Sequence, residues 1–424
     1  MWEKISQIWK VKELRNKILF VLAMLLIFRV AAHIPIPGVN IESLKNLFQS
    51  NQILGLLSIF SGGGMENFSL VMMGVAPYIT ASIIFQLLTM VIPKLEEMQK
   101  EGEAGREKIN QYQRILTVPL AMMQAFAMIK FLNQSGQGIV DSMGIMQLVT
   151  TLIVITAGTM FLMWIGELIS EKHIGNGISL LIFAGIVARV PTTVQQTFAT
   201  FDITKIGGLI IFAVIGLITV AGIVYITEGQ RNIPVSYAKR IRGNRTYGGV
   251  NTFLPLKINQ AGVIPIIFAV SIILFPPMIA QFFVSSSSAM VASVSQWVID
   301  FFQNQLFYAI MYFVMVVAFT YFYTAVIFHP TQISENLQKQ GGFIPGIRPG
   351  TPTSDFLGYV SNRIILGGAL FLGIIAILPN IVQSMTNSTS LVVGGTSLLI
   401  VVSVVIETVK QIESQLVMRN YEGF

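Results

Sequence analysis

The chain has 424 residues, of which 53% are hydrophobic and only 11% are charged, and its mean hydropathy is +0.70. A soluble domain carries about 25% charged residues, so this composition excludes a soluble protein and indicates a helical protein that crosses a membrane many times. The apolar runs are long and unbroken, unlike the alternating segments of a membrane β-barrel. The absence of cysteine excludes disulfides and thiolate chemistry.

The N-terminal stretch Trp2–Lys17 is basic and amphipathic and leads into a full-length apolar run. We therefore expect residues 1–17 to form a cytoplasmic segment along the membrane surface, with no cleavable leader. Apolar runs near the length that a bilayer requires then follow one another. The ten predicted crossings are Ile18–His33, Val71–Ile92, Ile115–Leu132, Gln147–Ser170, Ile174–Val190, Ile206–Thr227, Ile258–Val284, Gln305–Phe328, Arg363–Val382 and Leu391–Lys410.

The segment before the second crossing, Leu54–Leu70, is too short to cross and too apolar for an ordinary surface loop. It breaks at Ser61-Gly62-Gly63-Gly64. Irregular backbone at membrane depth is tolerated only when it is buried in protein or lines a cavity. We expect a re-entrant half-helix within the bundle, which the glycines make displaceable. An interfacial helix outside the bundle is the alternative.

Lysine and arginine predict the orientation, because cytoplasmic loops carry an excess of them. Most of the 27 basic residues lie on one side of the predicted crossings. The exceptions are Arg29, Lys45, Lys130, Arg189 and Lys205. We therefore expect an even number of crossings with both termini in the cytoplasm.

Two predicted cytoplasmic connections are long, residues 229–257 and 329–362. Glycine, proline and interspersed aromatic residues predict structured, protruding loops, and the first loop is strongly basic. Such loops suit docking of an anionic partner. Simple topological anchoring is the alternative.

No ionised residue lies in the middle of any predicted crossing, although a charge at that depth usually marks an ion, proton or substrate relay. The crossings instead carry apolar side chains at one-turn spacing, such as Val75 with Ile79 and Ile178 with Ile182. They also carry the polar residues Thr80, Ser82, Gln86, Gln124 and Ser271. Taken alone, both patterns are also typical of ordinary helix packing and interhelical hydrogen bonding.

Motifs for catalysis and cofactor binding are absent from the sequence. There is no phosphate-binding G-x-x-x-x-G-K-[ST] and no H-E-x-x-H. His33, His173 and His329 are dispersed at the ends of predicted crossings and form no metal cluster. The sequence therefore predicts no enzyme, no metal, no cofactor and no direct nucleotide binding.

Eight ordered motifs spread over the whole chain resemble those of one family. They are HIPIPG at His33–Gly38, SGGG at Ser61–Gly64, APYITASII at Ala76–Ile84, EGEAGR at Glu101–Arg106, GNGIS at Gly175–Ser179, NQAGVIP at Asn259–Pro265, PGIRPG at Pro345–Gly350 and GGTS at Gly394–Ser397. In these the chain resembles the bacterial SecY family, the core subunits of the protein-translocation channel.

The resemblance implies an all-α fold of ten transmembrane helices in two inverted, pseudo-symmetric halves, residues 18–199 and 200–410, around an hourglass pore, with a tail at 411–424. The implied pore ring consists of Val75, Ile79, Ile178, Ile182, Ile264, Ile266 and Ile400. Val75 is smaller than the isoleucine often found at that position. The implied plug, about residues 57–68, includes Leu57, Ser61, Gly62, Gly63, Gly64 and Phe68.

A lateral gate is implied between the second, third, seventh and eighth crossings, with Thr80, Gln86, Gln124 and Ser271 at gate positions. Some relatives carry an amide where Ser271 stands. Lys239, Arg240, Arg242 and Arg348 would contact the SecA ATPase or the ribosome. The other implied partners are SecE, SecG, anionic lipids, and unfolded secretory and membrane-protein substrates. The implied function is to pass these polypeptides across the bacterial plasma membrane and to release transmembrane segments sideways into lipid.

Two other classes of protein remain open at this point. A secondary transporter with inverted repeats would show broken helices around a polar site at mid-depth. The break at Ser61–Gly64 fits that class, but no acidic residue at the middle of a predicted crossing accompanies it. A membrane-embedded enzyme would need a catalytic constellation inside the crossings, and none is legible.

Overall fold

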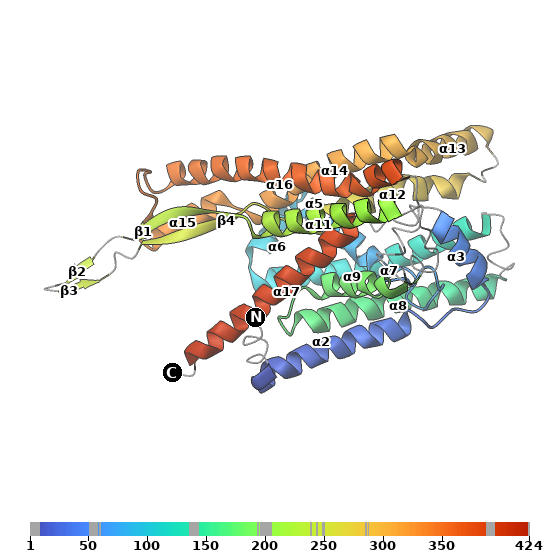
Figure 1. The fold of residues 1–424 in the computed structure, drawn as a ribbon, viewed down its shortest axis with the longest axis horizontal. Helices are drawn as coiled ribbons and strands as arrows, with labels where there is room; N and C mark the ends of the chain where they lie inside the picture. The colour runs from blue at the N-terminus through green and yellow to red at the C-terminus, as the bar shows by residue number, and fades with distance from the viewer. Residues whose placement is uncertain are drawn as a thin grey trace.

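The computed structural model describes residues 9–50, 58, 61–134, 144–192, 195, 206–237, 240–242, 245–247, 251–284, 286, 288–386 and 395–422. The fold is a bundle of helices with a small group of strands at one end (Figure 1). The helices are α2 (Lys12–Ala31), α3 (Ile41–Ser50), α5 (Ala76–Val91), α6 (Pro93–Lys100), α7 (Glu103–Gln134), α8 (Ile145–Ser170), α9 (Gly177–Val187), α11 (Ile206–Glu228), α12 (Ile264–Phe283), α13 (Ala289–Gln303), α14 (Gln305–Ile327), α15 (Pro330–Lys339), α16 (Thr351–Thr386) and α17 (Gly395–Glu422).

Every predicted crossing overlaps with a helix, namely α2, α5, α7, α8, α9, α11, α12, α14, α16 and α17. By length and composition, four helices in the described part of the chain could cross a membrane, or up to five if the bent pair α5 and α6 forms one crossing. Those four stretches are Glu103–Asn133, Ile145–Ser170, Leu306–Lys339 and Thr351–Pro379. Helix α9 has only 11 residues, which is short for a crossing.

Several helices extend past the predicted ends of the crossings. Helix α2 begins at Lys12, so residues 12–17 are continuous with the helix of the first predicted crossing. Helix α17 likewise runs to Glu422, through most of the predicted tail. Lysine, glutamate, glutamine and arginine are good helix formers, so a helix does not stop where the apolar run stops.

Other helices begin sharply because a side chain caps them. Asn176 precedes α9, and its side chain accepts hydrogen bonds from the backbone N–H groups of Ile178 and Ser179. Asn304 caps α14 in the same way. Helix α5 is followed by α6 at an angle of 102°, and the bend falls at Ile92–Pro93. Proline cannot donate the hydrogen bond that would continue the helix.

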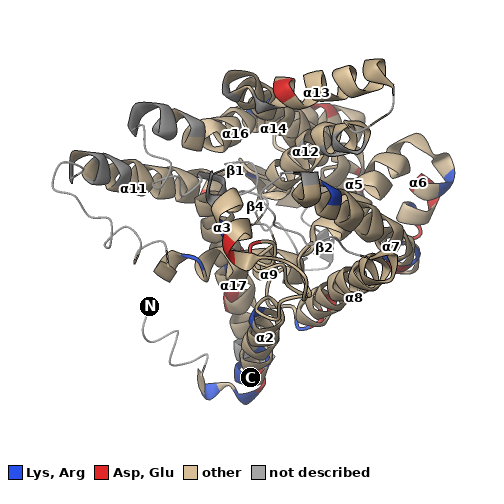
Figure 2. Ribbon diagram, turned by 90° about the vertical axis from the view of Figure 1, so that its right-hand side faces the viewer, with Lys and Arg blue, Asp and Glu red and all other residues tan. Residues whose placement is uncertain are grey.

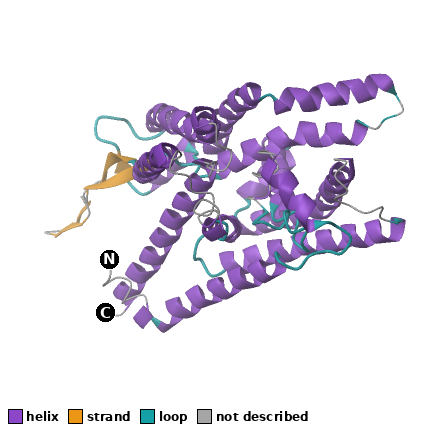
Figure 3. Cartoon of the chain, turned by 45° about the vertical axis from the view of Figure 1, so that its right-hand side comes forward, coloured by secondary structure: helices purple, strands orange, loops and turns teal. Residues whose placement is uncertain are grey.

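The strands are β1 (Gln230–Tyr237), β2 (Arg240–Arg242), β3 (Arg245–Tyr247), β4 (Asn251–Lys257) and β5 (Gly342–Phe343). They form an antiparallel sheet of order β4-β1-β5 and a separate β2–β3 hairpin. In Figure 3 the strands project from the bundle, and in Figure 1 α13 lies at the opposite end. The two long loops predicted from the sequence are therefore structured, and β5 joins the second loop to the first.

Charged residues occupy short stretches of most helices, and most of the ribbon as a whole is uncharged (Figure 2). Many helices also expose large apolar side chains, such as Leu26, Leu217 and Leu306, which are 67%, 72% and 72% exposed. An exterior of this kind suits contact with lipid tails. The described polar and charged contacts between helices therefore lie in the interior of the bundle and at its ends.

Candidate functional site

The residues of the implied pore ring come from four helices and meet in one buried apolar cluster. Val75, Ile79, Ile182, Ile266 and Ile400 are all buried members of this cluster. Ile178 and Ile264 are partly buried and pack against it. We call these seven residues the candidate ring.

Local sequence explains why most of these residues lie where helices begin. Helix α5 starts at Ala76 with Pro77 at its second position, directly after Val75. Helix α12 starts at Ile264 with Pro265 in the same place, and the Asn176 cap places Ile178 in the first turn of α9. Proline is favoured in the first turn because its missing N–H would have no helical partner there.

Two residues of the implied lateral gate are brought into contact. Gln124 on α7 lies with its Nε2 3.4 Å from the hydroxyl of Thr80 on α5, and both side chains are buried. The Ser271 hydroxyl instead donates to the carbonyl of Ile267, one turn earlier on α12, at 2.9 Å. Gln86 is half-buried on α5. Helix α12 packs against α5, α7 and α14, so the four gate helices are neighbours.

The plug prediction is only partly within the described residues. Leu57 and most of the predicted half-helix lie outside them, whereas Ser58 is helical and residues 61–75 form successive turns. Residues 61–69, here called the glycine-rich segment, are buried or half-buried inside the bundle. In its described part the segment is thus irregular backbone enclosed by protein, which the interfacial alternative did not predict.

One side of the glycine-rich segment lies against α2 and α9. Gly62 has φ +69°, and a Cβ atom there would lie 2.4 Å from the ring of Phe28 and 3.3 Å from the Cα of Gly185. Gly185 is on α9, just under one turn after Ile182. The segment therefore contacts α9 just under one turn after the candidate-ring residue Ile182.

The other side of the segment is anchored by apolar packing. Phe68 is fully buried in a second cluster with Leu44 and Phe48 of α3, and with residues of α7 and α8. Its φ of 45° is unusual for a residue with a side chain. Backbone hydrogen bonds from Ile36 N to Phe68 O (2.9 Å) and from Leu70 N to Ile34 O (3.0 Å) join the segment to the chain after α2.

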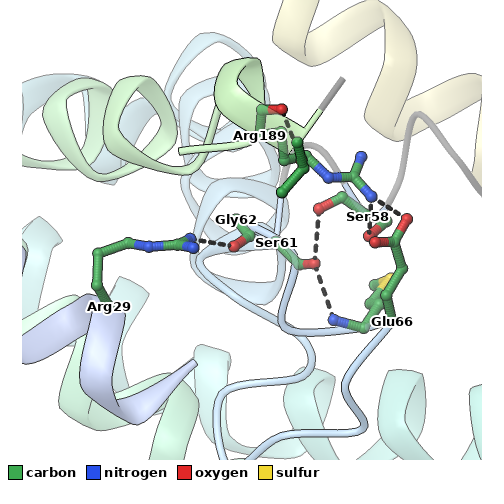
Figure 4. A network of polar contacts seen from close by, with 8 residues as sticks. Arg29, Ser58, Ser61, Gly62, Glu66 and Arg189 are labelled. Atoms are coloured by element: carbon green, nitrogen blue, oxygen red, sulfur yellow. Dashed lines mark hydrogen bonds and ion pairs between the residues drawn. The ribbon is translucent and has the colours of Figure 1, made fainter. Parts of the chain in front are cut away.

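A polar network on the segment was missed by the sequence analysis (Figure 4). Arg29 of α2 donates to the carbonyl of Gly62 at 2.7 Å. Arg189, just after α9, pairs with the carboxylate of Glu66 and lies 3.3 Å from the hydroxyl of Ser58. The available signal was that Arg29 and Arg189 are among the few basic residues on the predicted non-cytoplasmic side.

The predicted docking residues lie on the strand end of the molecule. Arg348 is exposed in the turn between β5 and α16. Arg240 and Arg242 lie on β2, where the structure describes the backbone, and Lys239 lies outside the described residues. A third apolar cluster, which includes Ile233, Leu256 and Ile344, packs beneath the sheet and holds both loops together.

Across the described residues, no group of three or more histidine, cysteine, aspartate or glutamate side chains could hold a metal ion. The site consists of branched aliphatic side chains packed in one cluster, a buried glycine-rich turn beside this cluster, and a few neutral polar contacts. Such an arrangement gives non-directional contact and no nucleophile or acid–base pair.

Comparison with solved structures identifies the fold. The fold matches a structure described as "The structure of a protein conducting channel", with a TM-score of 0.65 and 17% identity, over 94% of this chain and 91% of the other. It also matches Sec61 in the canine ribosome-channel complex, with a TM-score of 0.61 and 16% identity over the same shares. The fold is therefore that of a protein-conducting channel.

The sequence comparisons identify the family. The SecY family model matches residues 69–409. Proteins named protein translocase subunit SecY are 46% identical in Mycobacterium tuberculosis (strain ATCC 25618 / H37Rv), over 97% of both chains, and 45% identical in Corynebacterium glutamicum, over 99% of both chains. The chain belongs to the SecY family.

The family gives the function in outline. SecY is a multi-pass membrane protein and the channel-forming subunit of protein translocase, and the family is not one of enzymes. The resemblance drawn from the eight sequence motifs is confirmed. The secondary transporter and the membrane-embedded enzyme are no longer alternatives.

Proposed function

We propose that the candidate ring is a passive apolar valve through which unfolded polypeptides pass. The observation that carries this proposal is the meeting of Val75, Ile79, Ile182, Ile266 and Ile400, from four helices, in one buried cluster. Nothing in this set of side chains binds one client sequence in preference to another. Aliphatic side chains also offer water no hydrogen-bond partners. When no client is present, water therefore leaves the constriction, and the dry constriction blocks ions.

The glycine-rich segment closes the same passage between clients, and its contact with Gly185 next to the ring supports this role. Client segments that are apolar leave sideways through the gate formed by α5, α7, α12 and α14. Their transfer into lipid is driven by about 25 cal/mol per Å² of apolar surface removed from water. The exit is a partitioning step and requires no catalytic group.

The orientation and the surroundings follow from the charge distribution. Ten crossings in two inverted halves place both termini in the cytoplasm of a bacterium, and the channel lies in the plasma membrane. Arg348 and the β2–β3 hairpin face the cytoplasm, where a motor or the ribosome docks. The Sec61 match comes from a ribosome-channel complex, which supports the ribosome as one partner. SecA, SecE, SecG and anionic lipids complete the assembly.

Ion conductance tests the ring. Replacing Ile79, Ile182 or Ile400 by serine removes apolar groups worth about 0.8 kcal/mol per methylene, so water enters the constriction more readily. We expect the resting conductance of the reconstituted channel in planar bilayers to rise by roughly tenfold for each variant, since about 1.4 kcal/mol corresponds to that factor.

The matched control is Ile182→Leu, which keeps the apolar volume and should leave the resting conductance close to that of the parent. Serine variants with unchanged conductance would refute the ring. Conductance that rises equally in the leucine variant would point to a packing defect and would count against it too.

A further inference from the structure

The glycine-rich segment is held in two chemically different ways. On the side of α3, α7 and α8 it is anchored by the buried Phe68. On the side of α2 and α9 its charged contacts are made by Arg29 and Arg189, and the Asn67 side chain adds a longer hydrogen bond of 3.4 Å to the carbonyl of Ala32. The two arginines reach the segment from opposite directions, one to a backbone carbonyl and one to a side-chain carboxylate (Figure 4).

Glu66 is the residue on which this polar side depends. It is the acidic residue of the segment, and it is paired with Arg189 although both side chains are mostly buried, with 23% and 25% exposed. A carboxylate that lost this arginine would be left largely out of water without its ion-pair partner, which is unfavourable. The pair therefore favours one position of the segment over any position that separates it from the end of α9.

Local hydrogen bonds make the turn rigid enough to be held at these points. The Ser61 hydroxyl donates to the carbonyl of Ser58 at 3.0 Å and accepts from the N–H of Met65 at 3.2 Å. The N–H of Gly63 also donates to the carbonyl of Ser58, at 2.8 Å. A displacement of Gly62 or Glu66 is thus transmitted to Ser58 and Met65. Gly62 and Gly63, with φ of +69° and +82°, adopt the backbone conformation that this turn requires.

We propose that Arg29, Glu66 and Arg189 form a polar clamp that holds the glycine-rich segment beside the candidate ring and sets how often the segment leaves it. This inference rests on the proposed function in one respect, because it takes the segment to be the closure of the channel. It adds the residues that hold the closure. Opening breaks the Glu66–Arg189 pair and the Arg29 bond to Gly62, and Phe68 keeps the segment attached on its other side.

A single thiol reports on the position of the segment. The chain has no cysteine. Ser61 lies next to Gly62 on the clamped side of the segment and is buried, so Ser61→Cys is nearly isosteric and introduces one protected thiol. A membrane-impermeant maleimide then reacts only when the segment is displaced. In lipid vesicles we expect Glu66→Gln and Arg189→Gln, each in the Ser61→Cys background, to raise the labelling rate by roughly tenfold, the effect of losing one hydrogen bond to a charged group.

A double-mutant cycle separates the clamp from general loosening. If Glu66 and Arg189 act as a pair, the double glutamine variant should label no faster than either single variant. The matched control is Arg114→Gln, which removes an ion pair of 2.7 Å to Glu167 between α7 and α8, away from the segment. It should leave labelling unchanged.

Variants of Arg29 give a second test of the clamp that does not depend on whether the Arg189 variants fold. Arg29→Gln should accelerate labelling, and Arg29→Lys, which keeps a charged donor, should accelerate it less. Unchanged labelling in the Glu66 and Arg29 variants would overturn the clamp. So would additive effects in the double variant, or equal acceleration by Arg114→Gln.

The same vesicles distinguish this inference from the proposed function. If the parent channel translocates a secretory client while the clamp variants label like the parent, the clamp is wrong and the channel function stands. If the parent channel translocates no client while labelling follows the predicted order, the clamp stands and the assigned role of the segment as a closure is wrong.

Discussion

The same basic side chain has different roles at the two ends of this molecule, and its surroundings decide which. Arg189 is mostly buried and is paired with Glu66. Arg348 is exposed in the turn before α16. A buried charge in a bundle is expensive unless it is paired, so it fixes internal structure. An exposed charge costs little and is available to another molecule.

Charge reversal at Arg348 tests that second role. We expect Arg348→Glu to reduce SecA-driven transport of a secretory substrate into proteoliposomes by roughly tenfold, because it replaces attraction to an anionic partner by repulsion. Its exposure predicts that the thermal stability of the channel is unchanged. Lys339→Glu, an equal change of charge at an exposed position of the neighbouring α15, should have a smaller effect.

Normal ATP-dependent transport by Arg348→Glu would contradict a docking role for this residue. An equal loss in Lys339→Glu would show that net charge of the loop, and no particular contact, governs the interaction.

At this scale the sequence predicted residue types better than residue pairs. The aliphatic positions of the candidate ring follow from motifs, and the structure brings them into one cluster. Arg29 and Gly62 could not be paired from the sequence, because their bond ends on a backbone carbonyl that carries no side-chain signal. The Glu66–Arg189 pair required the packing of α9 against the segment, which periodicity does not contain.

Among the elements, α8 and α9 approach each other at the level of the backbone. A Cβ atom on Gly177 would lie 1.8 Å from the carbonyl oxygen of Gly166. The N–H of Gly177 also lies 3.0 Å from the Ser170 hydroxyl, which in turn donates to Gly166. Only glycine permits this approach, which fixes the start of α9 and therefore the direction of Ile178 and Ile182.

Gly177→Ala is therefore expected to destabilise the bundle by about 1–3 kcal/mol, the usual effect of overpacking, and to lower the midpoint of thermal unfolding in detergent. Gly367→Ala is the matched control, since a Cβ atom at Gly367 of α16 meets no described atom within 4 Å. In a helix interior this exchange should be neutral or slightly stabilising. Equal midpoints for the two variants would contradict the close contact of α8 and α9.

Hydropathy located the helices of the crossings but not their ends, nor the elements outside them. Helices α3, α6, α13 and α15 carry no long apolar run, and α15 is recognisable only once its apolar face lies against α16. The strands were also missed. Strand β5 is two residues long and exists because β1 pairs with it, so its signal lies in another loop.

For the molecule as a whole, the gate predicts that α5 and α12 must separate for transport. These helices are in contact. A cysteine placed on each, oxidised to a disulfide, should abolish export of a secretory client, and reduction should restore it. The chain supplies no competing thiol. A disulfide between α14 and α16, which pack together on one side of the gate, is the control and should leave export intact. Full export with the α5–α12 disulfide formed would remove the gate from the mechanism.

The overall class followed from composition and motifs, and the match to SecY bears it out. The inverted relation proposed for the two halves has no signature in hydropathy, because such a relation concerns backbone paths and not side-chain patterns. The count of crossings stays a prediction for the same kind of reason. A crossing must be long enough and apolar enough for the bilayer. Short helices such as α9 reach that length only together with the residues that flank them.

The strand β5 has a mechanical consequence for the whole channel. Strands β1 and β4 continue into α11 and α12, and Ile258 N bonds to Gly229 O at 2.9 Å where these strands leave the helices. Strand β5 belongs to the connection between α14 and α16 and hydrogen-bonds to β1. A molecule that pushes on this sheet therefore applies force to four helices, α11, α12, α14 and α16. The displacement that it imposes is shared among these helices and does not bend a single loop.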